Sequence, residues 1–293
     1  MIRPISLEEV QSLLQHYSKR DRMYLDINQY SADLRGLFVH DKLVAAWTSW
    51  QVPLHPYLLA FAVVSASYIS DFTLVGPEII GDLMQAARQY RGLVFADYNP
   101  QTEFMDWLVK QGFSNARCRV STSLNLKQLP LAVPGALTRG QLLTGTELQA
   151  DAKLSVDFVR LTWQQFAYTR RDNPVIAFDP DTWTELALRG WEQAAPVVIV
   201  DDGAVQAYVL LRRDQQGELT LSWAWATDVH YMRELLPHVL QYAQEHTQVL
   251  HAQFSSTDVY ERFVHNSYPF KDVPELAIYV RMNVAIGGGL NAH

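Results

Sequence analysis

LVFADYNPQTEFMDWLVKQGFSNARCRVSTSLNL, from Leu93 to Leu126, is the stretch that decides the expected fold. An apolar run leads into turn residues, a helical pattern, Gly112-Phe113 and a second alternating run. This order predicts a strand, a turn, a helix and a strand. Leu250 to Val284 repeats it, and Asn99 to Phe113 and Ser256 to Phe270 both span fourteen positions. We interpret the two stretches as one fold unit used twice.

The composition is that of a globular protein, with 293 residues of which 48% are hydrophobic and 19% charged. This length suits two domains. No apolar run is long enough to cross a bilayer, and the first residues lack the apolar core of a secretion signal. The single cysteine, Cys118, excludes an intrachain disulfide. We therefore expect a cytoplasmic protein without membrane contact.

The net charge of −7 lies entirely in the second half of the chain. Residues 1–127 hold 12 basic and 12 acidic side chains, whereas residues 128–293 hold 12 and 19. No basic cluster is long enough to follow a phosphate backbone, so nucleic acid is not an expected partner. The acidic half is either a solvated surface or a source of attraction for a cationic amine.

The first predicted domain covers residues 1–127. Arg35 to Trp50 is a predicted hairpin, and Leu58 to Ser67 is a predicted strand. The triplet that begins at Gly76 matches a helix start, with Gly76 as the cap and Pro77 at the first helical position. The first domain is thus expected to mix strands and helices.

A linker is expected at residues 128–137, where prolines and a glycine interrupt any helical or strand period. The second predicted domain follows at 138–286, and 287–293 form a predicted flexible tail.

The second domain is expected to follow the plan of the first. Pro196 to Arg212 is its clearest hairpin, and Glu218 to Thr227 is a strand. A helix follows, and Pro237 is tolerated only in a first turn, which predicts a start near Arg233.

This order of elements resembles the GNAT acyltransferase superfamily, here as a tandem pair. The matching features are Asn99 with the helix that ends at Gly112-Phe113, and the hairpin from Pro196 to Leu211. The resemblance implies an α/β (α+β) fold of two acyl-CoA N-acyltransferase-like domains, each a mixed, mostly antiparallel sheet flanked by helices. It also implies that each sheet splays between its fourth and fifth strands, and that acyl-CoA enters this wedge with its pantetheine on the end of the fourth strand.

The cofactor loop of the family departs from its usual pattern in both halves. The family places the pyrophosphate on a loop reading Gln/Arg-x-x-Gly-x-Gly/Ala at the start of the next helix, where free N–H groups favour an anion. Val75–Gly81 instead contains Pro77 and Glu78, and Asp228–Glu234 contains no glycine. The resemblance still implies acetyl-CoA or another acyl-CoA as co-substrate. It assigns cofactor contacts to six residues, Val75, Gly76, Asn99, Thr227, Arg233 and Ser256.

Acyl transfer to an amine also needs a proton acceptor and a proton donor. In the family the donor is often a tyrosine five positions before the Gly-Phe phenylalanine. That position is Leu108 in the first half, which cannot donate, and His265 in the second, which can. Tyr260 and Tyr268 are nearby alternatives. Asp228 is either a base or a helix cap, and Asp97 has the same two interpretations. The nine histidines show no metal-type pairing, so no metal is expected.

Two functions fit these features. The first is an acyl-CoA-dependent N-acyltransferase, an acetyltransferase in the simplest case, that acts on a small-molecule amine. The second is a ligand-binding or interaction module that kept the fold and lost the cofactor loop. The sequence does not predict the oligomeric state.

Overall fold

The computed structural model of the chain describes residues 1–19, 21–66, 72–98 and 103–283. Asn99 and the predicted tail 287–293 lie outside these ranges. The chain forms two compact units. The N-terminal unit contains Met1–Arg117, Asp172–Ile176 and the strand that begins at Leu276, and the C-terminal unit contains Cys118–Arg171 and Ala177–Glu275.

In the N-terminal unit, a sheet is flanked by four α-helices of the described chain. Its strands are β1 (Ile2–Pro4), β2 (Arg35–Val39), β3 (Lys42–Val52), β4 (His55–Ser65), β5 (Gly92–Asp97) and β12 (Leu276–Met282). Its helices are α1 (Leu7–Leu14), α2 (Arg22–Gln29), α3 (Phe72–Ala86) and α4 (Glu103–Lys110), with the short 3₁₀ helices η1 (Ser31–Asp33) and η2 (Ala87–Gln89).

The C-terminal unit repeats this plan with one more helix. Its strands are β6 (Ser114–Asn125), β7 (Gln141–Thr144), β8 (Pro196–Asp201), β9 (Ala204–Arg213), β10 (Leu219–Ala226) and β11 (Val249–Ser255). Its helices are α5 (Gly145–Ala150), α6 (Ala152–Tyr168), α7 (Pro180–Leu188), α8 (Val229–His246) and α9 (Val259–Ser267), with the 3₁₀ helix η3 (Leu126–Gln128).

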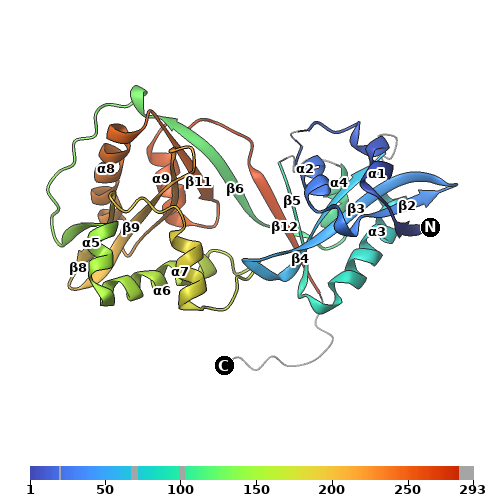
Figure 1. The fold of residues 1–293 in the computed structure, drawn as a ribbon, viewed down its shortest axis with the longest axis horizontal. Helices are drawn as coiled ribbons and strands as arrows, with labels where there is room; N and C mark the ends of the chain where they lie inside the picture. Colours follow the sequence, from blue (N-terminus) through green and yellow to red (C-terminus); the bar gives the residue numbers. More distant parts are fainter. Residues whose placement is uncertain (20, 67–71, 99–102, 284–293) are drawn as a thin grey trace. The chain divides into compact units, whose positions relative to one another are not determined.

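Each unit takes its last strand from the other half of the sequence. The N-terminal sheet has the order β1-β2-β3-β4-β5-β12, and the C-terminal sheet has the order β7-β8-β9-β10-β11-β6. β12 runs antiparallel to β5, from Ala277 opposite Asp97 to Met282 opposite Gly92. β6 runs antiparallel to β11 (Figure 1). The compact units therefore differ from the predicted sequence halves 1–127 and 138–286 at the final strand of each.

Both predicted hairpins form, and their turns explain the local sequence. His40 and Asp41 have φ angles of 48° and 60°, and Asp202 and Gly203 have 50° and 71°. Two successive residues with positive φ make a turn whose twist matches that of paired strands, and Asp and Gly adopt this conformation more readily than other residues. The hairpins β2–β3 and β8–β9 are thus set by their turns.

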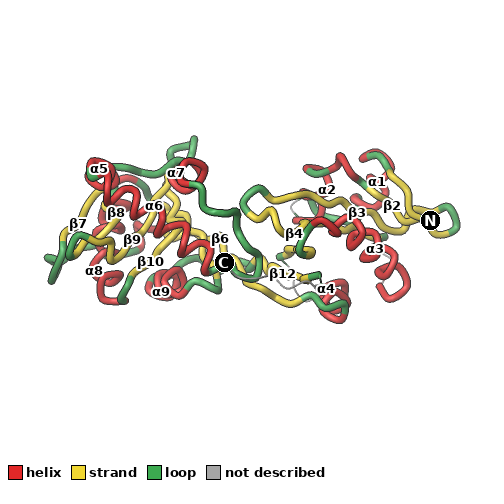
Figure 2. Tube along the Cα trace, turned by 90° about the horizontal axis from the view of Figure 1, so that it is seen from below, coloured by secondary structure: helices red, strands yellow, loops and turns green. Residues whose placement is uncertain are grey.

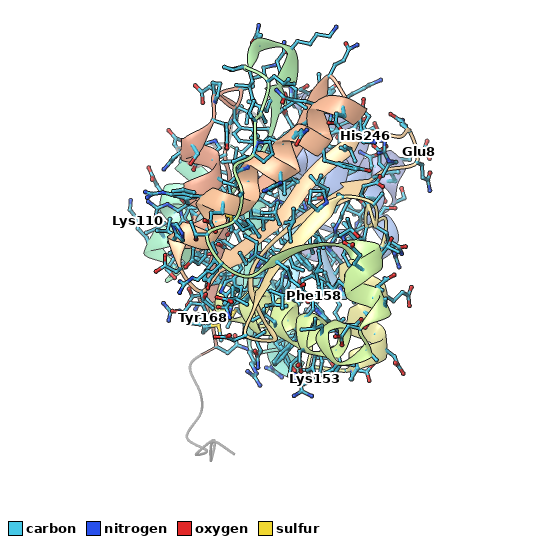
Figure 3. The ribbon with its side chains drawn as sticks, turned by 90° about the vertical axis from the view of Figure 1, so that its left-hand side faces the viewer. Glu8, Lys110, Lys153, Phe158, Tyr168 and His246 are labelled. Atoms are coloured by element: carbon cyan, nitrogen blue, oxygen red, sulfur yellow. The ribbon has the colours of Figure 1, made fainter. Side chains whose placement is uncertain are left out.

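The predicted fold class is confirmed. Each described sheet is mostly antiparallel, with one parallel pair, β4–β5 or β10–β11. Figure 2 shows α5, α6 and α7 on one side of the C-terminal strands and α8 and α9 on the other. Two apolar clusters follow from this layering, and Phe158 on α6 belongs to one of them. In Figure 3 Phe158 lies on the inner side of α6, whereas Lys153 points outward.

The predicted starts of two helices are wrong. α3 begins at Phe72 and contains Pro77 in its interior, and α8 begins at Val229 and contains Pro237. In both cases the apolar face extends upstream of the proline, and burying that face adds a helical turn. This burial outweighs the hydrogen bond that the proline removes. None of the described helices combines the length and apolar character that crossing a bilayer requires.

Candidate functional site

A wedge opens between β4 and β5 in the N-terminal unit. The two strands pair in parallel only over Leu58–Ala60 and Gly92–Val94. Beyond this short ladder β4 continues to Ser65 and β5 to Asp97 without pairing to each other. Diverging strands leave backbone groups that face a gap, so this end of the sheet is where a ligand can insert.

A cavity of about 450 Å³ lies at the open end of this wedge. This volume is within the range of small-molecule sites. The apolar part of its lining consists of Met23, Val63, Ala66, Phe72, Phe95 and Phe104, and the polar part consists of His16, Tyr17, Ser65, Asp97 and Glu103. These residues come from the end of α1, from α2, β4 and β5, and from the first residues of α3 and α4. The cavity therefore combines an apolar interior with groups that can exchange protons.

The backbone of Ser65 faces the wedge and is held there by a phenol. Ala66 N donates to Val44 O on β3 at 2.9 Å, so the N–H of Ser65 points to the opposite side, away from β3. It donates to the Tyr17 hydroxyl at 3.0 Å, and this hydroxyl donates to Ser65 O at 3.5 Å. Tyr17 thus occupies the hydrogen-bonding positions at the end of β4.

Two helices reach the cavity. Phe72 is the first described residue of α3 and Glu103 the first described residue of α4, and both contribute to the lining.

The predicted cofactor contacts of the first half lie elsewhere. Val75 and Gly76 are buried inside α3 rather than at its start. A Cβ at Gly76 would lie 2.3 Å from Trp107, so glycine is required there for close packing of α3 against α4. Their N–H groups are used within the helix, which removes the geometric reason for a phosphate contact. Asn99, the third predicted contact, is outside the described residues.

The family position for a proton donor is apolar in the N-terminal unit. Leu108 on α4 is fully buried in the core. Asp97, by contrast, lines the cavity at the end of β5, where one of its oxygens accepts from Tyr98 N at 2.7 Å. Asp97 therefore lies at the cavity, and both its interpretations, as a base and as a cap, stay predictions.

In the corresponding wedge of the C-terminal unit, a buried carboxylate lies at the end of β11. β10 and β11 pair in parallel over Leu219–Leu221 and Leu250–Ala252, and a bulge follows in β10. Ser256 N donates to Cys118 O on β6, so the N–H of Ser255 points toward β10. This N–H donates to a carboxylate oxygen of the buried Glu261 at 2.6 Å.

Further charged groups surround Glu261. Asp258 caps α9 by accepting from Tyr260 N and Glu261 N, and burial raises the pKa of its carboxyl group. Burial lowers the pKa of Arg170 to about 10, against the opposing influence of Glu261 and Asp258. The Tyr208 phenol, which is fully enclosed, has its pKa raised by burial and by the same two carboxylates. These groups form a buried network of charges near the end of β11.

Four predicted residues of the second half have structural contacts. Asp228 is the N-cap of α8 and accepts from His230 N at 2.7 Å. Thr227 donates from its hydroxyl to the Gln206 side chain at 2.8 Å. Arg233 lies over the Phe263 ring, and the Ser256 hydroxyl accepts from Cys118 N at 2.8 Å. The cap interpretation of Asp228 is thus the one that the geometry supports.

The two remaining candidates lie on α9. His265 contacts the rings of Phe254 and Phe270, at centroid distances of 5.1 and 5.8 Å. Tyr260 is half-buried, and its pKa is raised by burial and then by the nearby Asp228 carboxylate. The structure thus brings Tyr260 and Asp228 together and places His265 in an aromatic cluster.

Sequence reasoning missed Tyr17. Its position after Val10, Leu13 and Leu14 continues the helical apolar spacing, which is typical of a core residue. Nothing in the local sequence indicates that its hydroxyl reaches β4, because 48 residues separate it from Ser65. Within the ranges that the structure describes, no three His, Cys, Asp or Glu side chains are grouped as metal ligands.

The fold is similar to that of solved GCN5-related N-acetyltransferases. A GCN5-related N-acetyltransferase from Sphaerobacter thermophilus is similar to this chain, with 12% identity, coverage of 96% of this chain and 95% of the other, and a TM-score of 0.55. A tandem GNAT protein from the clavulanic acid biosynthesis pathway is 11% identical over 96% and 98% of the two chains, with a TM-score of 0.49. No protein-family model and no curated protein matches the sequence. The likeness to the first structure establishes the fold and leaves the activity to be argued from the site.

Proposed function

We propose that the chain is an acyl-CoA-dependent N-acyltransferase that acetylates, or otherwise acylates, a small-molecule amine in the wedge of its N-terminal unit. The observation that carries this proposal is the cavity at the diverging ends of β4 and β5, with the backbone of Ser65 facing it. In proteins of the GNAT superfamily, which this chain resembles, the acyl thioester and the acceptor meet at this place.

The side chains around the cavity can supply the proton transfers of the reaction. The amine nitrogen attacks the thioester carbonyl carbon, a C–N bond forms and the C–S bond breaks. The proton lost by the amine goes to a base, for which Asp97 and His16 are the lining candidates. The departing thiolate takes a proton from the Tyr17 hydroxyl, which regains one from solvent.

The groups at the cavity also suit an acyl-CoA. The Ser65 amide, now bonded to Tyr17, is the backbone donor that a pantetheine amide would use. Neither half carries the glycine-rich loop of the family, so the Ser65 amide is the backbone contact that this proposal offers to the co-substrate.

A thermal-shift titration with acetyl-CoA tests binding, and an acetyl-transfer assay with a panel of amines tests turnover. Saturation at a hundred times Kd stabilises a protein by about 2.7 kcal/mol. We expect Tyr17→Phe to lower turnover by about 10²- to 10⁴-fold, the usual contribution of a proton donor, while acetyl-CoA still binds. Tyr168→Phe, at an exposed tyrosine of the C-terminal unit, is the matched control.

The possible outcomes separate the two functions. Absence of any shift with acetyl-CoA, propionyl-CoA and free CoA would refute the acyltransferase. A shift without transfer to any amine would favour the ligand-binding module, for which the missing glycine-rich loops are the supporting observation.

A further inference from the structure

The cavity of the N-terminal unit has a chemical character that points to a class of acceptor. Resting on the proposed function, we infer that the acceptor is a primary amine joined by a short chain to a flat aromatic body. The aromatic body would pack on the phenylalanine wall of the cavity, and the ammonium group would lie near its two carboxylates.

The wall is built from three rings on three elements. Phe72 begins α3, Phe95 lies on β5 and Phe104 is in the first turn of α4. The Phe72 and Phe104 centroids are 4.8 Å apart, and the Phe95 and Phe104 rings meet edge to face at 5.4 Å. The Phe61 ring packs against Phe95, with their centroids 5.2 Å apart. A further aromatic ring can join such a cluster in the same offset or edge-to-face geometry.

The charge of the lining selects for a cation. Asp97 and Glu103 contribute two carboxylates, against one imidazole from His16. The described lining residues include no lysine or arginine. A carboxylate on the acceptor would be repelled, so free amino acids are disfavoured. The faces of the phenylalanine rings also attract an ammonium group.

The remaining lining argues against an acceptor with several charges. Met23, Val63 and Ala66 complete the apolar surface of the cavity. A polyamine would have to place its second or third ammonium against this surface, where desolvation opposes binding. One charge at one end of an apolar body is the pattern that the cavity matches.

Isothermal titration of the full chain, alone and with free CoA, tests this inference with three probes, 2-phenylethylamine, 3-phenylpropionate and spermidine. We expect only 2-phenylethylamine to bind. Phe104→Leu, which keeps an apolar side chain, should weaken its binding by up to about tenfold. Glu103→Gln should weaken it by about two- to fivefold, with less effect at high salt. Asp106→Asn, on the exposed side of the same helix, should change nothing.

The results also distinguish this inference from the proposed function. Suppose that 2-phenylethylamine binds with the expected variant effects but is not acylated by any acyl-CoA. This result supports the proposed binding site for an aromatic amine and overturns the acyltransferase function. Transfer to spermidine or to amino acids, with neither binding nor transfer for 2-phenylethylamine, overturns the acceptor class and leaves the acyltransferase. Equal binding of the amine and the carboxylate probe also overturns the inference, because the carboxylates would then have no selective role.

Discussion

Cutting the linker tests the exchange of final strands between the two units. A protease site placed after Val133, whose side chain is 81% exposed, would divide the chain into residues 1–133 and 134–293. β12 of the second fragment completes the sheet of the first, and β6 of the first completes the sheet of the second. We therefore expect the cut protein to remain a 1:1 complex in size-exclusion chromatography without denaturant.

The strength of this association can be changed at one residue. Ile278 on β12 is 6% exposed and packs with Leu58, Val94 and Val280. Replacing such an isoleucine by alanine costs about 2–5 kcal/mol. At 1.4 kcal/mol per factor of ten, Ile278→Ala should raise the Kd of the two fragments by about 30-fold to several thousand-fold. Met282→Ala is the control on the same strand, since Met282 is 48% exposed, and its effect should stay within about twofold.

The measurement is a dilution series of the cut protein, followed by size-exclusion chromatography or by fluorescence anisotropy of a labelled fragment. If each half kept its own last strand, the cut chain would separate into two independently folded domains. Separation of folded fragments at micromolar concentration would refute the exchange. Equal effects of Ile278→Ala and Met282→Ala would refute the burial argument.

Three further predictions concern residues outside the proposed site. Gly76→Ala should destabilise the protein by about 1–3 kcal/mol because its Cβ would clash with Trp107. Gly81→Ala should stabilise it by about 0.5–1 kcal/mol, because a Cβ at Gly81 meets open space, and thermal unfolding measures both effects. Asp228→Ala should cost about 1 kcal/mol through loss of the α8 cap yet leave turnover unchanged, and a large loss of turnover would contradict the cap assignment. The pKa of Asp258 is raised by burial, so its carboxyl group ionises in the unfolded chain at a lower pH than in the folded protein. As the pH rises from about 4 through the higher folded pKa, the free energy of unfolding of the wild type should therefore fall relative to that of Asp258→Asn. Urea unfolding across this range measures the difference, and the opposite trend would show that the fold stabilises the carboxylate.

The sequence predicts the elements of the fold better than their partners. The hairpins β2–β3 and β8–β9 follow from turn residues that lie next to one another in the chain. The pairing of β12 with β5 does not follow from the local sequence. The apolar pattern of residues 276–282 would be the same whichever strand they paired with, so it does not identify residues 92–97 as the partner. A repeat in the sequence therefore predicts that one unit was used twice, without indicating which copy contributes the last strand.

The site shows the same limit. The family position for a proton donor, five residues before Phe113 or Phe270, is Leu108 or His265, and both side chains pack in apolar surroundings. Tyr17 and Asp97 meet in one cavity only because α1 and β5 fold against the same wedge. Rules about the local chain also fail where burial competes with them, as at Pro77, where an apolar helix face overrides a helix-start signal.

The two wedges differ in how easily a ligand can displace the side chain at the strand end, and this predicts one acyl-CoA per chain. In the N-terminal unit the displaced group is the neutral Tyr17 hydroxyl, bonded to Ser65 N at 3.0 Å, and such a bond contributes about 0.5–1.5 kcal/mol. In the C-terminal unit the group lies at the end of β11, the counterpart of β5: the buried carboxylate of Glu261 accepts from Ser255 N at 2.6 Å. Hydrogen bonds to charged groups contribute about 1.5–3 kcal/mol, and the buried charge would lose a partner if a ligand displaced it. Isothermal titration with acetyl-CoA should give a stoichiometry of one, and Tyr17→Phe should tighten binding by up to about tenfold because the competing hydrogen bond is gone. A stoichiometry of two would show that Glu261 does not keep acetyl-CoA out of the C-terminal wedge, and weaker binding by Tyr17→Phe would show that the hydroxyl does not compete with the ligand.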